Sequence, residues 1–459
     1  MRLNPRTRFS ARLKLIVAAL LLQTYHPATA SAQNSGVMQL TLPQAIDLAL
    51  RQNQSLKLAQ LDVVDSELKK KIAHAGYFPR LKNESTAFHV TDLQQVVIPA
   101  GSLAVPGIAR PFPANTQIIG QGSLTAYTSG TGLSQPLTQM FKTRQENRAA
   151  EADIHSANDK LKEAQNDVVL KVTQLYYEIL IAHLKEEAAK AEADAAKVTL
   201  QENTSSVEKG SALEVTELES RAATLDAKQT ILQQSLQVRD LTLELNNLLG
   251  LPLNTKLQLS EQPFIAPSSI ASREECVRVA REQSPDVSAA KQAVERARAA
   301  VGVAKSAYIP DLTAFARYSY QSGIPFLVHN FGTFGAIFEY ELFDGGRRKA
   351  EIDEGRTMLS KAEVNLEKVE QEVTVQVEVA YDNVEQTHTL VTVAEEVLKA
   401  RAEGARIAES QFEQGVGPAS ARAEALSKMT SAKASLFEAN FELSLAQVEL
   451  KRVMGELPR

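Results

Sequence analysis

The 459-residue sequence has no tryptophan and a single cysteine, Cys276, and aromatic residues make up only 5% of it. One cysteine excludes an intrachain disulfide framework. Few aromatics beside abundant Ala, Glu, Lys, Leu, Gln and Val are typical of long helices rather than of compact globules. Cys276 lies in a helical pattern and is expected to be a buried structural thiol. We therefore expect the chain to form a long, extended molecule rather than several compact domains.

The sequence also lacks the patterns that enzymes and metal sites need. Six of the seven histidines lie beyond the first 32 residues and are scattered without metal-ligand spacing: His74, His89, His155, His183, His329 and His388. Neither a phosphate-binding loop nor a nucleophile elbow is present. We therefore predict a protein that is not an enzyme and that uses no cofactor and no metal.

Residues 1–32 have the pattern of a secretory signal peptide. Five basic residues precede the apolar run Leu15 to Leu22, and small residues follow at Ala28 to Ala32. An apolar run of about eight residues is too short to span a bilayer as a helix. We expect the mature chain to start near Gln33, and, because no cysteine follows, to carry no amino-terminal lipid anchor. Removing five basic residues moves the formal charge from −5 to about −10, which disfavours nucleic acid as a partner.

Two halves of the chain carry the same landmarks at fixed offsets, which indicates an internal repeat. Pro79 and Pro310 are 231 positions apart. Four later landmarks recur after 205 positions: Leu137 and Leu342, Tyr176 and Tyr381, Gly210 and Gly415, Gly250 and Gly455. We assign the repeats to residues 33–262 and 263–459, each ordered as helix, two strands, long helix, hairpin tip and helix. The 26 surplus residues of the first half match a Pro-rich segment, about 92–121, that is predicted to be an exposed loop.

The helical segments have coiled-coil character. One helix is predicted from about Thr143 to Val207, which at 1.5 Å per residue is roughly 100 Å long. In the last helix, apolar residues follow one another at alternating spacings of three and four: Met429, Ala432, Leu436, Ala439, Leu443, Ala446, Leu450 and Val453. Glycines permit the chain reversals near Gly210 and Gly415. Each half is thus expected to form one long helical hairpin.

Four short segments between the helices alternate in polarity, about residues 81–91, 122–135, 312–321 and 334–342. Such alternation is typical of membrane strands, although a soluble sheet packed on helices would also show it. Four strands cannot close a barrel, and lipid tolerates no open sheet edge. Two copies would give eight strands with a filled interior, whereas three give twelve and an open lumen. We predict a homotrimer whose strands form a barrel in lipid, with Arg317, Glu339 and Glu341 facing the barrel lumen.

Together these features resemble the family of TolC-type outer-membrane efflux proteins. The residues that carry the resemblance are the Tyr-x-Pro steps at Tyr77 and Tyr308, the Phe-Asp-Gly-Gly step from Phe343 to Gly346, and the paired hairpin glycines. The resemblance implies a mainly α fold with a β-barrel portion: long coiled-coil hairpins in a trimeric α-barrel, and four strands per chain in a twelve-stranded transmembrane β-barrel. It also implies a passive exit conduit for tripartite efflux or type I secretion, in the outer membrane and extending into the periplasm.

The resemblance further implies partners at the hairpin tips. A periplasmic adaptor would dock there and connect the channel to an inner-membrane pump of RND, ABC or MFS type. The matching tip residues are Gly210, Ser211, Gly415, Val416, Gly417 and Pro418.

The family's acidic entrance positions fall on Ala421, which departs from the pattern, and on Glu424, which fits it. We hypothesise a selective ring at Glu424, with Glu219 at the equivalent place in the first repeat. The alternative, held equally open, is that both are solvated residues flanking a heptad. For Arg422 the two interpretations are a contact that holds the closed entrance and an ordinary surface residue.

The competing interpretation of the whole chain is an exported coiled-coil scaffold or adhesin stalk that forms no channel. Heptads alone favour it. It does not explain two matched strand pairs between helices, nor why one half alone has a Pro-rich connection. A scaffold should extract with the soluble periplasm, whereas the channel should need detergent and run as a trimer.

Overall fold

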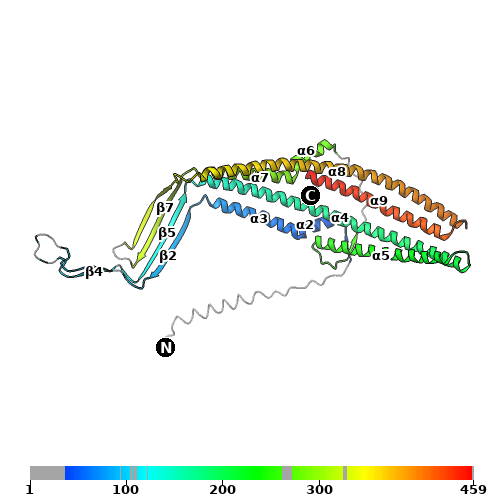
Figure 1. Cartoon of the computed structure of the whole chain (residues 1–459), viewed down its shortest axis with the longest axis horizontal. Coiled ribbons are helices and arrows are strands. Elements are labelled where there is room, and N and C mark those ends of the chain that lie inside the picture. Colours follow the sequence, from blue (N-terminus) through cyan, green and yellow to red (C-terminus); the bar gives the residue numbers. More distant parts are fainter. Residues whose placement is uncertain are drawn as a thin grey trace, which may run out of the picture.

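The computed structural model describes residues 37–93, 95–103, 107, 110, 112–120, 122–260, 271–323 and 328–456. The molecule is elongated, with a β-sheet toward one end and long helices running to the other (Figure 1). The predicted signal peptide, residues 1–32, and the predicted repeat boundary at residue 262 lie outside the described residues.

Both halves of the chain contain the same order of helices with nearly equal lengths. The first half has α2 (Leu42–Gln52), α3 (Gln54–Ala75), α4 (Met140–Glu208) and α5 (Glu214–Leu248). The second has α6 (Arg273–Gln283), α7 (Pro285–Ser306), α8 (Arg347–Glu413) and α9 (Ala419–Met454). The helices α4 and α8 have 69 and 67 residues. No described helix is both long enough and apolar enough to cross a bilayer.

Local sequence explains where the shorter helices begin. Asn53 separates α2 from α3, and its side-chain oxygen accepts hydrogen bonds from the backbone N–H groups of Ser55 and Leu56 at 2.9 and 3.2 Å. Such a side chain satisfies amides that have no partner in the first turn of a helix. At the equivalent place in the second half, Ser284 precedes Pro285, whose fixed φ suits the first turn of α7.

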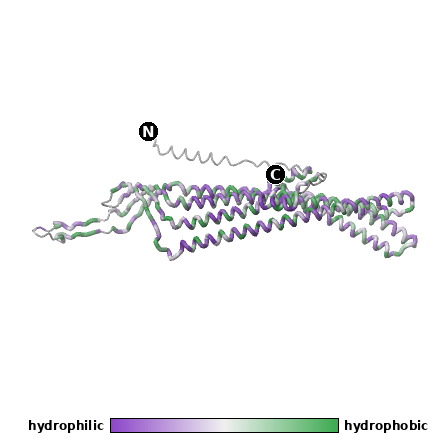
Figure 2. The backbone as a smooth tube through the Cα atoms, turned by 90° about the horizontal axis from the view of Figure 1, so that it is seen from above, coloured by the Kyte–Doolittle hydropathy of each residue, from purple (hydrophilic) through white to green (hydrophobic). Residues whose placement is uncertain are grey.

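The helices lie side by side in a fixed lateral order. Near the sheet, α3 contacts α4, α4 contacts α7, and α7 contacts α8. Toward the tips, α5 contacts α4, α4 contacts α9, and α9 contacts α8. The outer edges of this layer are therefore α3 and α5 on one side and α8 on the other. Hydrophobic and hydrophilic residues alternate along the helices, as Figure 2 shows, which is expected of helices with one packed face.

The main sheet contains four antiparallel strands in the order β2 (Arg80–His89), β5 (Thr125–Pro136), β7 (Asp311–Ser322) and β8 (Asn330–Glu339). The pairing of β5 with β7 joins the two halves. Among the described residues, the outer strands β2 and β8 each pair on one side only. A mainly helical chain with four barrel-type strands, as predicted, is what the structure has.

A short ribbon that the sequence did not predict lies in the Pro-rich connection between β2 and β5. It pairs β3 (Gln95–Ile98) with β4 (Gln117–Gly120) in antiparallel fashion, beyond the end of the main sheet (Figure 1). Four-residue strands give too few alternations for a period to be recognised.

A second unpredicted pair is parallel and joins β1 (Met38–Leu40) to β6 (Leu257–Leu259). It covers a buried cluster built on α4 and α5, which includes Val172, Leu175, Tyr176, Leu245 and Leu249. A matching cluster in the second half includes Cys276, Val377 and Leu443. Cys276 is fully buried, in agreement with the expected structural thiol, and its burial raises the pKa of the thiol.

Candidate functional site

One face of the sheet carries a charged pair that spans three strands. The Nη1 atom of Arg317 on β7 lies 3.6 Å from Oε2 of Glu84 on β2, so the arginine side chain crosses β5. A Cβ atom at Gly130 would lie 2.4 Å from Nε of Arg317. Glycine at this point of β5 therefore leaves the space in which the arginine lies. The strand register puts Glu339 on the same face as Arg317, so two of the three predicted lumen residues share a face.

The opposite face of β7 and β8 is aromatic. It carries Tyr318, Tyr320, Phe334 and Phe338, of which Phe334 is 88% exposed. Large apolar side chains that remain exposed in a single chain mark a surface made for a non-aqueous environment or a partner. In the second half of the sheet, the face of Arg317 and Glu339 is mixed, because it also carries Phe315, Phe331 and Ile337. The opposite face, with Tyr318 and Phe334, is therefore the more aromatic one.

On β2 and β5 the same face is polar, but its side chains bond to one another. Asn83 Nδ2 donates to Thr131 Oγ1 at 2.8 Å, Ser85 Oγ donates to Asn83 Oδ1 at 2.9 Å, and the hydroxyls of Ser85 and Ser129 are 2.9 Å apart. A polar group that already has a partner costs much less to remove from water. This network explains how the polar first-half strands belong to the same sheet surface.

A buried ion pair fixes the step from β8 into α8. The carboxylate of Asp344 accepts from the side chain and backbone of Arg348 at 2.7 and 3.1 Å, and from the backbone of Gly346 at 2.9 Å. These hydrogen bonds, that of the Arg348 side chain first, lower the pKa of Asp344 to about 2. The guanidinium of Arg348 lies between the rings of Tyr308 and Tyr340, 5.3 and 5.2 Å from their centroids. The geometry of this turn also needs two left-handed glycines, Gly345 and Gly346, with φ of 65° and 90°.

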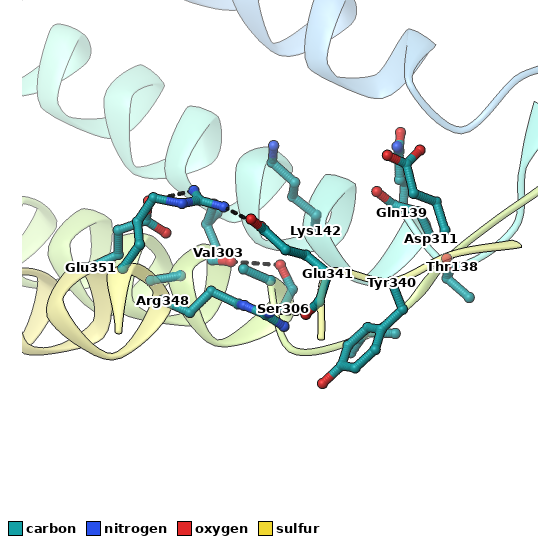
Figure 3. Close-up of a pocket in the computed structure, with 15 residues that line it drawn as sticks. Thr138, Gln139, Lys142, Val303, Ser306, Asp311, Tyr340, Glu341, Arg348 and Glu351 are labelled. Atoms are coloured by element: carbon teal, nitrogen blue, oxygen red, sulfur yellow. Dashed lines mark hydrogen bonds and ion pairs between the residues drawn. The ribbon is translucent and has the colours of Figure 1, made fainter. Parts of the chain in front are cut away.

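The predicted lumen residue Glu341 lies beyond the last residue of β8, at the wall of a pocket of about 500 Å³ (Figure 3). Its carboxylate pairs with Arg347 at 2.9 Å, and Arg347 also pairs with Glu351 at 2.9 Å. The pocket walls come from α4, α7, the start of β7 and the β8–α8 step. Glu341 therefore belongs to the junction between sheet and helices, where Glu339 also lines the pocket, whereas Arg317 is not among the lining residues.

The two hairpin tips reverse the chain in the same way. Helix α4 is followed by Gly210 and α8 by Gly415, with φ of 70° and 71°. Ser211 closes the first tip by donating from its hydroxyl to the carbonyl of Ser206 at 2.9 Å. In the second tip Val416 is 77% exposed, Gly417 follows, and Pro418 is the residue before α9. All six predicted tip residues therefore lie in these two turns.

The charged residues near the tips do not converge within one chain. Arg422 donates to Glu409 of α8 and lies 5.0 Å from the ring centroid of Phe412, so its contacts are inside its own hairpin. Glu424 is exposed on α9 and accepts a hydrogen bond from Lys428. Glu219 is exposed on α5, in the other hairpin.

One contact near the tips was missed by sequence reasoning. The Oε1 atom of Glu202 on α4 accepts from the backbone N–H of Ser420, in the first turn of α9, at 3.1 Å. A carboxylate at a helix N-terminus satisfies a free amide and complements the helix dipole. The two residues are 218 positions apart, and no local pattern in the sequence connects them.

Two further findings bear on the class of protein. Among the described residues, no three His, Cys, Asp or Glu side chains are placed to hold a metal ion. Within the described part of the chain, the four-stranded sheet has two unpaired edges and lies at one end of long helical hairpins (Figure 1). A family profile described as "Outer membrane efflux protein" matches residues 45–251 and 276–456. The chain belongs to this family, as the resemblance in its sequence predicted.

Solved channel structures share the fold at low sequence identity. The CmeC outer membrane channel of Campylobacter jejuni superposes with a TM-score of 0.73 at 18% identity, over 90% of this chain and 85% of CmeC. The outer membrane protein VceC of Vibrio cholerae gives 0.69 at 17% identity, over 90% and 96% of the two chains. The open state of the MtrE outer membrane channel of Neisseria gonorrhoeae gives 0.66 at 18%, over 91% and 90%.

A curated relative matches over a shorter stretch. The outer membrane efflux protein BepC of Brucella suis biovar 1 is 28% identical over 158 residues, which are 34% of this chain and 35% of BepC. The match thus spans about a third of the length of that relative.

Proposed function

We propose that the chain is one protomer of a passive outer-membrane conduit that serves as the exit of a tripartite efflux system. The observation that carries the proposal is the four-stranded sheet, whose edge strands β2 and β8 have no partner on one side within the described part of the chain. Hydrocarbon cannot hydrogen-bond to backbone groups, so a sheet in lipid must close into a barrel. One chain supplies four strands, and three chains supply twelve, enough for an open lumen.

The repeat supports closure by further copies of the same chain. By repeat position, β2 corresponds to β7 and β8 corresponds to β5. Within the chain β5 pairs with β7, so β8 of one copy can pair with β2 of the next in the same way. Arg317 and Glu339 then line the lumen, and the aromatic face of β7 and β8 meets lipid. Pairing of this kind leaves no free edge in a closed trimer.

We further propose the hairpin tips as the docking site for a periplasmic adaptor. The tips lie at the end of the molecule opposite the sheet (Figure 1), where a conduit in the outer membrane would reach toward the inner membrane. Val416 offers the adaptor an exposed apolar side chain. An inner-membrane pump of RND, ABC or MFS type would supply the energy, and type I secretion is the same conduit with a protein as cargo.

Purified mature protein tests this function directly. We expect it to need detergent for extraction, to run at the mass of a trimer, and to give discrete conductance steps in planar lipid bilayers. An exported scaffold would instead extract with the soluble periplasm. A water-soluble monomer that leaves bilayers without conductance would overturn the proposal.

The proposed entrance ring at Glu424 has a test of its own. In a trimer, three copies of Glu424 would attract divalent cations at the tip entrance. Replacing Glu424 by glutamine should raise the concentration of divalent cation that blocks half of the single-channel current by roughly three- to tenfold, because exposed charges interact through screened water. Replacing Lys428, which pairs with Glu424, by glutamine should lower this half-blocking concentration. Unchanged block in Glu424→Gln would identify Glu424 as an ordinary surface residue.

A further inference from the structure

The outer edges of the helical layer carry two exposed apolar stripes with matching spacing. On α8 the stripe contains Val379, Leu390, Val397 and Ile407, which are 54, 51, 45 and 43% exposed. On α5 it contains Leu243, Leu232, Leu225 and Val215, which are 37, 65, 59 and 52% exposed. Both stripes have spacings of 11, 7 and 10 residues, in opposite chain directions. Two antiparallel helices with these spacings can bring all four pairs together at once.

The junction between the two halves shows how such edges meet. There α4 and α9 pack antiparallel, with Glu202 bonded to the backbone of Ser420 at 3.1 Å. Helix α8 repeats α4 at an offset of 205 residues, and α9 repeats α5 at the same offset. The residue of α8 equivalent to Glu202 is Ile407, and the residue of α5 equivalent to Ser420 is Val215. If the outer edges pack as α4 and α9 do, Ile407 lies opposite Val215.

The same register aligns the rest of the two stripes. It sets Val397 opposite Leu225, Leu390 opposite Leu232, and Val379 opposite Leu243. It also brings Leu218 of α5 opposite Gly404 of α8, where a Cβ atom would meet nothing within 4 Å. Four other exposed apolar residues find no apolar partner in this register: Val375, Val393 and Phe412 on α8 and Leu236 on α5.

The part of α8 nearer the sheet follows the same rule with α3. Within the chain, α7 meets α4 through Ser288 and Asp159 at 2.6 Å and through Arg296 and Asp153 at 3.4 Å. Helix α7 repeats α3 at an offset of 231 residues. On the outer edges, the equivalent contacts would join Val364 of α8 to position 57 of α3, and Met358 of α8 to position 65. Leu58 and Val64 are the adjacent residues of α3. All four of these side chains are exposed, by 65, 49, 65 and 47%.

The helix α4, at the junction within the chain, and the helix α8, at the outer edge, carry different types of residue at equivalent positions. The six apolar residues of α8 named above correspond on α4 to six polar residues: Asp153, Asp159, Gln174, Lys185, Glu192 and Glu202. Four of these make polar contacts across the junction within the chain, such as Lys185 with Glu438 at 2.8 Å. The α8 edge has apolar side chains in their place, and exposed apolar patches of this kind mark interaction surfaces.

We propose that α8 of one copy packs against α3 and α5 of the next copy in this register, through six apolar contacts. We call this set of contacts the between-copy seam. The occupant is a second copy of this chain, because the opposite edge of the chain carries the apolar residues that match the α8 stripe. Each copy offers both edges, so the contact is heterologous and closes as a ring. The between-copy seam rests on the proposed trimeric conduit and adds its register and its chemistry.

Paired cysteines test the register. In the variant that carries Leu390→Cys and Leu232→Cys, oxidation with copper phenanthroline in detergent should link most chains into covalent dimers and trimers on a denaturing gel. Shifting one partner by seven residues, in Leu390→Cys with Leu225→Cys, moves it about 10 Å along the helix. That distance exceeds the reach of a disulfide, so this variant should show little linkage. The native Cys276 is fully buried and supplies the same low background to each variant.

A third variant reports on the fold itself. Lys185 and Phe437 are the residues of α4 and α9 that correspond to Leu390 and Leu232. In Lys185→Cys with Phe437→Cys, the disulfide should therefore form within one chain, without any increase in mass on the gel. Efficient linkage of the shifted pair in place of the matched pair would overturn the register. Absence of between-chain links in a protein of trimeric native mass would overturn the seam and leave the conduit standing. Absence of links together with a monomeric, non-conducting protein would overturn both proposals.

Discussion

Replacing Tyr176 by alanine is expected to lower the free energy of unfolding by about 3 to 5 kcal/mol, the usual cost of removing a buried aromatic side chain. The residue is 1% exposed and packs on α4 among Val172, Leu175 and Leu245. Its hydroxyl lies 2.7 Å from the carbonyl oxygen of Ser260 and 3.1 Å from that of Leu40. Tyr176 thus joins α4 to β1 and to the residue that follows β6. Thermal or denaturant unfolding followed by circular dichroism measures the loss.

Two controls separate packing from hydrogen bonding at this position. Tyr176→Phe keeps the ring and removes the hydroxyl donor from the carbonyl of Ser260, whereas the carbonyl of Leu40 still accepts from the backbone N–H of Ser260. The lost hydrogen bond should cost about 1 to 3 kcal/mol. Tyr381 is the equivalent residue in the second half, half-buried, with its ring under the guanidinium of Arg273 at 4.7 Å. Tyr381→Ala should therefore cost only about 1 to 2 kcal/mol. Equal losses for Tyr176→Ala and Tyr381→Ala would contradict the asymmetry of the two cores.

Replacing Gly455 by alanine is expected to produce the second large loss of stability. Gly455 ends α9 with φ of 77°, and an added Cβ atom would lie 2.5 Å from the carbonyl oxygen of Gln283. A left-handed conformation costs a residue other than glycine about 1 to 3 kcal/mol. The contact adds to this cost, because the backbone between α6 and α7 has to move.

The glycine at the second hairpin tip provides the matched control. Gly415 has nearly the same φ, 71°, but an added Cβ atom there would meet nothing within 4 Å. Gly415→Ala should therefore lower the free energy of unfolding only by the cost of the left-handed conformation. The difference between the unfolding midpoints of the two variants measures the close approach of α9 to Gln283. Indistinguishable midpoints would show that the approach contributes nothing.

The fold was predictable from the sequence where the two halves repeat each other. The hairpin glycine and the pair of alternating strands each occur once in both halves, so that one weak pattern supports the other. The pair of β1 with β6 was not predictable, because Met38 and Leu257 are distant in sequence and each strand has three residues. The ribbon of β3 with β4 was missed for the same reason of length.

The candidate site was predictable by residue type more than by contact. The alternation of β7 identified Arg317 as a residue of the polar face, but its partner Glu84 depends on the missing side chain of Gly130. Glu341 was assigned to the same face by period, yet β8 ends at Glu339. For Arg422, the sequence left two interpretations open, and the structure shows a contact with Glu409 inside its own hairpin. Side-chain contacts between distant segments leave no periodic trace in a single sequence.

The 26 surplus residues of the first half show where this chain tolerates growth. They lie at the outer turn between β2 and β5, and every landmark after them keeps its 205-residue offset. One residue added within α4 would instead rotate all later side chains of that helix by about 100° and break their alignment with the helices on which they pack. The turn between β2 and β5 is therefore the place for an affinity tag or a foreign epitope. The helical hairpins can be lengthened only by whole heptads, with equal insertions in both helices of a hairpin.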